Sequence, residues 1–442
     1  MKRPSRQDVF RQMEKRKVRF VQLWFTDVLG FLKGLTIPVA QFRHALQHGM
    51  AFDGSSIEGF ARIEESDMVV KPDLASFAIL PWEVQSERAG RVFSDVMTPA
   101  GKSVTSDPRY VLRQVIQRCR RLGFTPYAGC ELECFYFKSS AQPEFLDHSG
   151  YFDLTPVAVA ERVRHDTIDA LEALGVPVEY SHHEVSKSQH EVDLRYSEAL
   201  TMADNVITAR FVAKQVAQAN NVHVSFMPKP VFGVNGSGMH VHLSLFKNGR
   251  NAFFDAGKQM CLSDTARHFI AGLLKYAEEI TAVTNQWVNS YKRLVPGYEA
   301  PVYVSWAQMN RSALVRVPAF DKKRPNAARC EYRSPDPACN PYLAFAVLLA
   351  AGLEGISRKL KLNSPTSDNI YRMTPEERRA AGIGSLPSDL FGAILKAESS
   401  KLVRDTLGDE LFDQFVRNKK LEWDEYKSQV TEYEVQRYLP IL

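Results

Sequence analysis

The sequence feature that most constrains the fold is a short polar loop that runs directly into an alternating strand near the middle of the chain. Residues 235–238 are Asn-Gly-Ser-Gly, and glycine lets a backbone approach an anion closely. Polar and apolar residues then alternate, which in a β-strand separates them onto two faces. One face carries His240, His242 and Ser244, and the other carries Val241, Leu243 and Leu245. The polar face meets either a ligand or a set of histidines that hydrogen-bond within the protein.

The composition excludes several classes of protein. With 442 residues, of which 45% are hydrophobic, the chain can bury large cores and should form two or more domains. Its 56 basic and 51 acidic side chains leave a formal charge of +5. Apart from the first twenty residues and residues 118–121, the basic side chains are not gathered into a stripe. A nucleic-acid partner is therefore not expected.

The N-terminus and the cysteines indicate the compartment. The first residues are rich in Lys and Arg but have no apolar segment, so no secretory signal is predicted. No apolar run reaches the length of a membrane span, so no membrane partner is expected. The six cysteines are scattered without a CxxC pair, which favours free thiols and a cytoplasmic location.

Residues 1–105 are predicted to form a small mixed domain. Helices are expected at residues 6–16 and 41–48, and strands at 18–25, 32–37, 68–70, 75–80 and 92–95. Asp107 and Pro108 then supply a helix cap and a first-turn proline, and Gly123 marks the end of that helix. The domain boundary is placed just before the cap.

Residues 106–442 are predicted to form a larger domain of longer elements. Strands are expected near residues 129–138, 302–306, 312–317 and 328–333, with a strand pair at about 222–227 and 239–246. Helices are expected from Thr155-Pro156 to Gly175, at about 197–220, 263–282 and 341–359, and through the last ninety residues. Antiparallel strands interleaved with long helices indicate an α+β fold rather than a doubly wound sheet.

Carboxylates cluster on several of the predicted strands. Glu131 and Glu133 lie two residues apart and share a face, where like charges repel unless a cation lies between them or one is protonated. Such a pair alone is weak evidence, because exposed strand faces often carry two glutamates. Glu184 and Glu191 follow on either side of a loop, and Glu331 lies in a later strand.

Arginines accompany these carboxylates at positions 293, 311, 316, 329 and 333. Oxygen ligands with an occasional imidazole suit Mg²⁺ or Mn²⁺, and arginines neutralise phosphate and carboxylate groups. With a glycine-bearing loop, this set is typical of phosphoryl transfer. Neither a P-loop nor a GxGxxG fingerprint is present, so the residues alone indicate a metal-dependent enzyme for anionic substrates. A zinc hydrolase competes, but the set holds much carboxylate and little histidine in metal spacing.

Several long motifs in order resemble bacterial type I glutamine synthetase along nearly the whole chain. They are residues 52–60 (FDGSSIEGF), 182–185 (HHEV), 235–240 (NGSGMH), 289–301 (NSYKRLVPGYEAP), 329–333 (RCEYR), 336–337 (DP) and 340–342 (NPY). The resemblance implies a β-grasp-like N-terminal domain followed by a catalytic domain of antiparallel strands with flanking helices. It also implies that ATP phosphorylates the γ-carboxylate of glutamate and that ammonia then displaces the phosphate.

The resemblance implies two or three Mg²⁺ or Mn²⁺ ions in each active site. It assigns ligands to two of these ions. One would be held by Glu133, Glu184 and Glu191, and the other by Glu131, His240 and Glu331. The residues implied for glutamate binding are Glu133, Asn235, Gly236, His240, Arg293, Glu299, Arg311 and Arg333. Those implied for ATP binding are Glu179, His242, Ser244, Arg311, Arg316 and Arg329.

The catalytic roles implied by the resemblance fall on Asp53, Glu299, Arg311 and Arg333. Asp53 would take a proton from ammonium, and Glu299 would lie in a flap that shields the acyl phosphate from water. Plainer interpretations are that Asp53 is a turn residue before Gly54, that Arg316 is a surface ion-pair partner, and that His242 is a hydrogen-bonded core histidine.

Assembly and regulation follow from the same resemblance. Family members form dodecamers of two stacked hexameric rings with active sites shared between subunits, so Asp53 would act on a neighbour. Arg62 matches the feedback-inhibited alpha-type branch, the context of Tyr371 does not match the adenylylated branch, and a nitrogen-regulatory protein is a further expected partner.

Two alternatives and one departure stay open at this point. The alternatives are a ligase of the same fold that joins glutamate to a larger amine, such as a polyamine, and a catalytically silent regulatory relative. The departure is Ser186-Lys187-Ser188 where the family often has a small residue and glycine, which makes the backbone near Glu191 less permissive.

Overall fold

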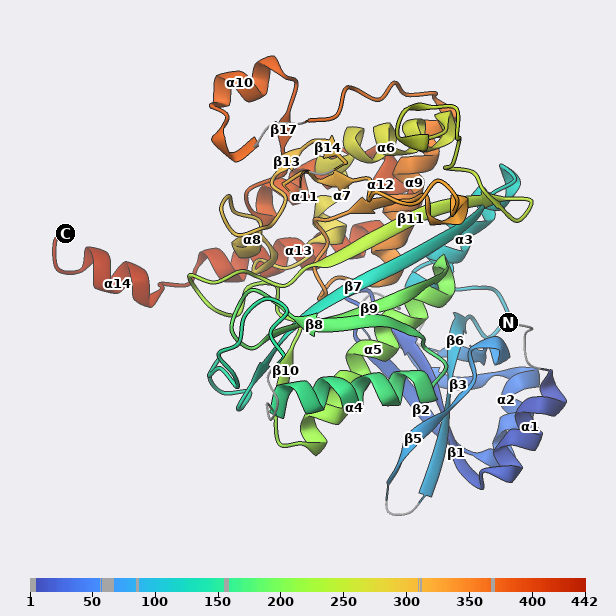
Figure 1. The fold of residues 1–442 in the computed structure, drawn as a ribbon. Coiled ribbons are helices and arrows are strands. Elements are labelled where there is room, and N and C mark those ends of the chain that lie inside the picture. Colours follow the sequence, from blue (N-terminus) through green and yellow to red (C-terminus); the bar gives the residue numbers. More distant parts are fainter. Residues whose placement is uncertain are drawn as a thin grey trace.

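The computed structural model describes residues 5–55, 57, 67–84, 87–154, 159–308, 310, 312–366 and 370–442. The chain forms a small N-terminal domain and a larger domain built on a nine-stranded sheet (Figure 1). The helix α14 (Glu432–Tyr438) extends away from the body of the molecule and carries the C-terminus at its tip (Figure 1). No described helix is long and apolar enough to cross a bilayer.

The described residues of the small domain form two α-helices packed on a six-stranded sheet of order β2-β1-β6-β4-β3, with β5 paired to β6. Its helices are α1 (Arg6–Lys15) and α2 (Phe42–His48), and its strands are β1 (Val18–Thr26), β2 (Leu32–Pro38), β3 (Met50–Asp53), β4 (Asp67–Pro72), β5 (Ala78–Val84) and β6 (Glu87–Met97). β1 and β6 are parallel and the other pairs are antiparallel. The sequence does not predict β3, a short edge strand that ends at Asp53.

The large sheet has the order β14-β15-β16-β11-β7-β9-β8. Its strands are β7 (Thr125–Phe137), β8 (Val178–His183), β9 (Gln189–Glu198), β10 (His223–Ser225), β11 (Met239–Lys247), β12 (Arg250–Asn251), β14 (Trp306–Ala307), β15 (Val315–Arg316) and β16 (Cys330–Tyr332). The predicted pairing of residues 222–227 with 239–246 is wrong. Both strands pair with β7 instead, β10 along residues 135–137 and β11 along residues 125–132, because β7 is long enough for two partners on one edge.

The helices of the large domain cover the sheet and fill its core. They are α3 (Pro108–Arg121), α4 (Val159–Ala173), α5 (Ala199–Ala219), α6 (Asp264–Lys275), α7 (Ala277–Thr284), α8 (Ser290–Arg293), α9 (Pro341–Ser357), α10 (Pro375–Ala380), α11 (Leu390–Glu398), α12 (Lys401–Leu407) and α13 (Asp409–Lys427). The helix predicted at 263–282 is two helices separated at Tyr276. The predicted cap at Thr155-Pro156 lies outside the described residues, and β13 (Tyr303–Val304) pairs with β17 (Gly384–Ser385) apart from the main sheet.

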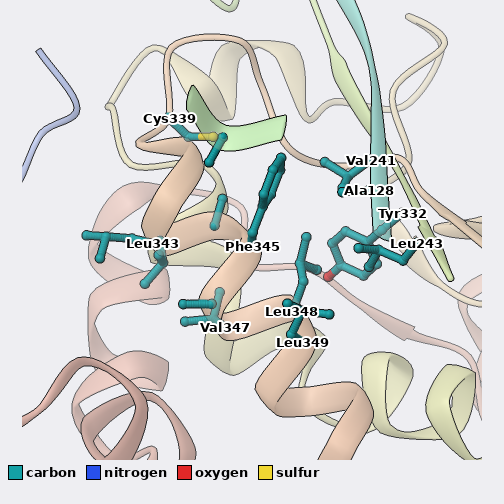
Figure 2. Packing of buried hydrophobic residues seen from close by; sticks show 14 of the residues in the cluster. Ala128, Val241, Leu243, Tyr332, Cys339, Leu343, Phe345, Val347, Leu348 and Leu349 are labelled. Atoms are coloured by element: carbon teal, nitrogen blue, oxygen red, sulfur yellow. The ribbon is translucent and has the colours of Figure 1, made fainter. Parts of the chain in front are cut away.

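Helix α9 is the centre of the core and is apolar on all sides, as expected of a helix enclosed by other elements. Figure 2 shows its side chains beside Val241, Leu243 and Tyr332 of the sheet. Gly272 of α6 packs against its other side, where an added Cβ would lie 2.1 Å from the carbonyl oxygen of Ala351. This packing supports the apolar face of β11, so the opposite face of that strand is free to form a site.

Buried polar contacts join the two domains. Arg109 of α3 binds Asp73 and Asp95 of the small domain and, through two hydrogen bonds, Asp204 of α5. Asn340 donates to the backbone carbonyls of residues 27 and 28 in the β1–β2 turn. All six cysteines are buried and unpaired.

Candidate active site

A cavity of about 750 Å³ opens on the polar face of the large sheet. Strand alternation directs Glu131 and Glu133 of β7 toward it, while Leu132 and Cys134 are buried on the opposite face. The other residues that line it are Tyr151, Phe152, Tyr180, His182, Glu184, Val185, Gln189, Glu191, Asn235, Gly236, His240, Arg293, Gly297, Tyr298, Glu299, Asn310, Ser312, Arg316, Arg333 and Tyr371.

Two groups of side chains in or beside the cavity have the spacing of a cation site. In the first, one ligand atom each from His182, Glu184 and Glu191 lie within 4.8 Å of one another. His182 was not predicted, although it lies two residues before Glu184 at the end of β8. Glu133, which the resemblance assigns to this cation, accepts hydrogen bonds on one carboxylate oxygen from the backbone amide of Gly238 at 2.8 Å and from Gln189 at 3.0 Å.

The second group consists of Glu131, His242 and Glu331. His242 Nε2 lies 2.6 Å from one Glu131 oxygen, and His240 Nδ1 lies 2.7 Å from the other. His240 Nδ1 is also 3.8 Å from Glu331. Both imidazoles therefore meet at Glu131, with the predicted ligand His240 between the two glutamates and His242 beside them.

Crowding of carboxylates perturbs their protonation. Burial, followed by the charge of Glu184, raises the pKa of Glu133 to about 8. Burial and the neighbouring Asp193 raise the pKa of Glu191 well above its ordinary value. Burial opposes ionisation of Glu131 too, but His242 and His240 hold its pKa well below its ordinary value. Several carboxylates are thus held close together at a cost that a bound cation would relieve.

The predicted arginines contact this cluster or the cavity wall. Arg316 and Arg333 both bind Glu331, which is fully buried. Arg293 is buried and donates to the backbone carbonyls of Ser334 and Arg333, at 2.6 and 3.2 Å. Arg329 donates to His242 at 3.2 Å. Arg311 lies outside the described residues, as does Arg62.

Two loops form one side of the cavity. Gly236 is required because an added Cβ would lie 2.3 Å from the carbonyl oxygen of Pro228. Glu299 has φ of 54°, an uncommon backbone conformation for a residue with a side chain. Its carboxylate accepts a hydrogen bond from Asn235 at 3.1 Å. The hydroxyl of Tyr371 donates to the carbonyl oxygen of the adjacent Ala300 at 2.8 Å.

Other predicted site residues lie outside this cavity. Asp53 is an exposed residue at the end of β3, and none of the described residues that line the cavity comes from the small domain. Glu179 is exposed on β8, and Ser244 is buried further along β11. Their predicted roles, like those of the whole set, stay predictions.

Aromatic side chains that the sequence did not predict line one part of the cavity. Phe152 stacks on His182 with ring centroids 4.3 Å apart, and Tyr180 stacks on the same imidazole at 5.9 Å. Tyr151 meets that imidazole edge-on at 5.5 Å. The adjacent aromatic pair Tyr151-Phe152 was the available signal.

Comparison with known proteins identifies the family of this chain. Two family models match it, "Glutamine synthetase, beta-Grasp domain" over residues 17–99 and "Glutamine synthetase, catalytic domain" over residues 105–438. The chain belongs to the glutamine synthetase family. Glutamine synthetase of Thermotoga maritima is 51% identical over 433 residues, which cover 97% of this chain and 98% of that protein. Glutamine synthetase of Methanosarcina mazei is 49% identical over 99% of this chain and 98% of its own length.

Solved structures also match the fold of this chain. A GmaS/ADP complex matches with a TM-score of 0.88 at 30% identity, over 98% of this chain and 99% of that one. Plasmodium falciparum glutamine synthetase has the same TM-score at 24% identity, over 98% of each chain, and this likeness concerns the fold alone.

These similarities confirm three predictions: membership of bacterial type I glutamine synthetase, the α+β fold with an N-terminal β-grasp domain, and ligase activity that joins ammonia to glutamate. Glutamine synthetases use ATP and a divalent metal, so both are expected of this enzyme. A ligase for larger amines and a catalytically silent relative are not favoured.

Proposed function

We propose that this glutamine synthetase phosphorylates glutamate and joins it to ammonia within the carboxylate-lined cavity. The observation that carries the proposal is the arrangement of two carboxylate and imidazole groups on one sheet face, beside buried arginines. Carboxylate and imidazole suit Mg²⁺ or Mn²⁺, and the raised pKa values of Glu133 and Glu191 fit a site built for added positive charge.

The cations would be held by the predicted ligands Glu131, Glu133, Glu184, Glu191, His240 and Glu331, with His182 and His242 beside them. When bound, such ions neutralise phosphate oxygens and polarise the transferred phosphoryl group. Two or three ions per site are expected from the family pattern, and Mg²⁺ and Mn²⁺ are both suitable.

Substrate binding falls to the arginines. Arg293 and Arg333, buried at the cavity wall, would bind the two carboxylates of glutamate, with Asn235 and Gly236 near its α-carbon. Arg316 and Arg329 would meet the ATP phosphates together with Arg311, and Glu179, His242 and Ser244 are the remaining predicted nucleotide contacts. The γ-carboxylate oxygen of glutamate then attacks the γ-phosphorus of ATP, and ADP leaves as the acyl phosphate forms.

Ammonia completes the reaction. Asp53 would accept a proton from ammonium, and the freed lone pair attacks the acyl carbon and displaces phosphate. A backbone hydrogen bond from Ser55 holds the pKa of Asp53 below its ordinary value, so this carboxyl is ionised at neutral pH. Glu299, in its flap, would keep water from the acyl phosphate.

Asp53 would act in a neighbouring subunit, because the described residues lining the cavity of its own chain all lie in the large domain. This arrangement supports a homo-oligomer with shared sites, and the family pattern suggests a dodecamer of two hexameric rings. Feedback inhibition through Arg62 in an alpha-type branch, and a nitrogen-regulatory protein partner, complete the proposal. Six unpaired thiols support a cytoplasmic location.

The experiment that tests the function measures phosphate release and glutamine formation with ATP and glutamate. Ammonium should stimulate both in equal amounts, and putrescine should not replace it. Asp53→Ala should lose the ammonium-dependent rate. Turnover that is independent of ammonium, or that is faster with putrescine, would contradict the proposal.

Shared sites have a separate test. Asp53→Asn and Glu331→Gln enzymes should each be inactive, because each lacks one half of every site. Random reassembly of an equal mixture should restore about a quarter of the wild-type activity, since each site needs both intact halves. A mixture that stays inactive after reassembly would contradict the action of Asp53 across subunits.

A further inference from the structure

A second polar layer lies directly beneath the first cation group. Strand alternation turns Glu191 toward the cavity and the preceding His190 to the opposite side. Glu184, which directly follows the last residue of β8, also lines the cavity, whereas the preceding His183 does not. His183 and His190 are paired across β8 and β9, and their ring centroids are 4.5 Å apart.

Both imidazoles converge on Asp147. His183 Nε2 lies 2.7 Å from one carboxylate oxygen and His190 Nε2 lies 3.1 Å from the other. The first oxygen also accepts the backbone amides of Ser188 and Ser149, at 3.1 and 3.2 Å. Asp147 comes from the irregular segment 138–154 between β7 and α4, so it ties that segment to two strands at once.

The hydrogen-bond partners fix which atoms carry protons. His190 Nδ1 faces the guanidinium of Arg164 at 2.9 Å, and because arginine only donates, His190 must carry its proton on Nε2, toward Asp147. His183 Nδ1 faces the carbonyl oxygen of Glu184 at 2.7 Å, so it donates there. The three side chains have the spacing of a cation site, and they contact one another there through the two Nε2 atoms and the Asp147 carboxylate.

Ser188, in the connection between β8 and β9, also binds the segment 138–154. Its hydroxyl accepts the backbone amides of Leu146 and Asp147, at 2.6 and 2.8 Å. Its φ of 59° is strained for a residue with a side chain, so this conformation needs support from its contacts. Ser188 belongs to the five-residue connection that leads from Glu184 toward Glu191.

We propose that Asp147 is a positioning residue for the first cation group, which it serves by fixing the backbone that carries Glu184 and Glu191. The inference rests on the proposed function of those glutamates as metal ligands. Residues that orient metal ligands from behind typically change metal affinity 10- to 100-fold when replaced. Asp147 contacts neither the cavity nor the second group, Glu131, His242 and Glu331, so its effect is confined to the first.

The variant Asp147→Asn is a sharp test because no orientation of the amide satisfies every partner. If its NH₂ group faces His190 Nε2, two donors meet. If it faces the other way, it meets the backbone N–H groups of Ser188 and Ser149. The size of the side chain is unchanged, so packing is preserved while the hydrogen bonds are not.

The experiment is a Mn²⁺ titration of the full-length enzyme, with free Mn²⁺ followed by electron paramagnetic resonance. Glu184→Gln and Glu331→Gln assign the bound ions to the first and second groups. Asp147→Asn should weaken binding at the first group about 10- to 100-fold and leave the second unchanged. The matched control is Asp169→Asn, an exposed aspartate on α4, which should bind as the wild type does.

Ser188 supplies a second variant in case Asp147→Asn folds poorly. Ser188→Ala removes the hydroxyl contacts but keeps the strained backbone, whereas Ser188→Gly removes both. Both should weaken the first group selectively. Unchanged binding in Asp147→Asn and Ser188→Ala, or equal weakening of both groups, would overturn the inference. A wild-type enzyme that binds no Mn²⁺ would instead overturn the proposed function.

Discussion

The side-chain amide of Asn235 donates a hydrogen bond to the carboxylate of Glu299, 64 positions later in the chain. The bond joins the glycine-bearing loop before β11 to the segment that carries Tyr298 and Ala300. Both loops line the cavity. In the proposed function, this contact would hold the flap over the acyl phosphate.

Removing that contact should uncouple the reaction. The bond is exposed to solvent and should contribute about 0.5–1.5 kcal/mol, so Asn235→Ala and Glu299→Ala should each raise phosphate release relative to glutamine formation by about two- to tenfold. Because the two act on one contact, the double variant should be no worse than either single one. The ratio of phosphate to glutamine measures this, with Glu354→Ala on α9 as the control. Additive effects would contradict the shared role.

Asp53 should increase the reaction rate only for a nucleophile that is protonated when it binds. Asp53→Asn should lower the rate with ammonium by a factor of about 10²–10⁴, the usual contribution of a general base. Hydroxylamine, which is unprotonated at neutral pH, should be affected much less. The ratio of the two rates in the variant and in the wild type is the measurement. An equal loss with both nucleophiles would assign Asp53 to binding or structure instead.

Metal binding should release protons. The pKa of Glu133 rises from 4.5 to about 8 and that of Asp193 from 3.8 to about 7, both first through burial. The pKa of each carboxyl is higher in the folded state than in the unfolded state. The free energy of unfolding therefore falls as the pH rises from the unfolded-state pKa to the folded-state pKa. The metal-free enzyme should therefore lose stability between about pH 4 and pH 8 through these groups, and cations should restore it.

Calorimetric titration with Mg²⁺ at pH 7, in buffers of different ionisation enthalpy, measures the proton release. The release should vanish above about pH 9, where the carboxyls are already ionised. Glu133→Gln should release fewer protons at pH 7. Identical heats in all buffers would show that the carboxylates are ionised before the cation arrives.

Arg109 should control the coupling of the two domains. It is buried and binds three aspartates, whereas Arg113, which shares Asp73 and Asp95 with it, is 32% exposed. Arg109→Met removes the arginine that binds the buried Asp204, which keeps the Tyr342 hydroxyl as a partner, and should cost about 3–5 kcal/mol. Arg113→Met should cost about 1 kcal/mol or less. Denaturant unfolding compares them, and equal losses would contradict a special role of Arg109.

Periodicity and capping residues predicted most of the fold. The alternation from residue 239 placed the correct side chains of β11 on each face, and Asp107-Pro108 marked the start of α3. The pairing of β10 was wrong because alternation reports the face of a strand but not its neighbours. The contact of His242 with Glu131 could not be predicted for the same reason, because it depends on the register of β7 with β11, in which Glu131 lies opposite His240.

The polar layer beneath the cavity could not be predicted. Asp147 lies in an irregular segment without periodicity, and its partners come from two other strands. Ser188 is an instructive intermediate case. Its identity predicted a less permissive backbone, but only the fold reveals the hydrogen bonds that support it.

The six unpaired cysteines, all sealed inside the protein, have a practical consequence. Burial raises the pKa of the Cys119 and Cys134 thiols to about 12, so neither forms a reactive thiolate in the native enzyme. An alkylating dye can then label a molecule only after it opens. The rate at which the dye labels the cysteines therefore measures how often the native protein opens locally or globally, with no added labelling site.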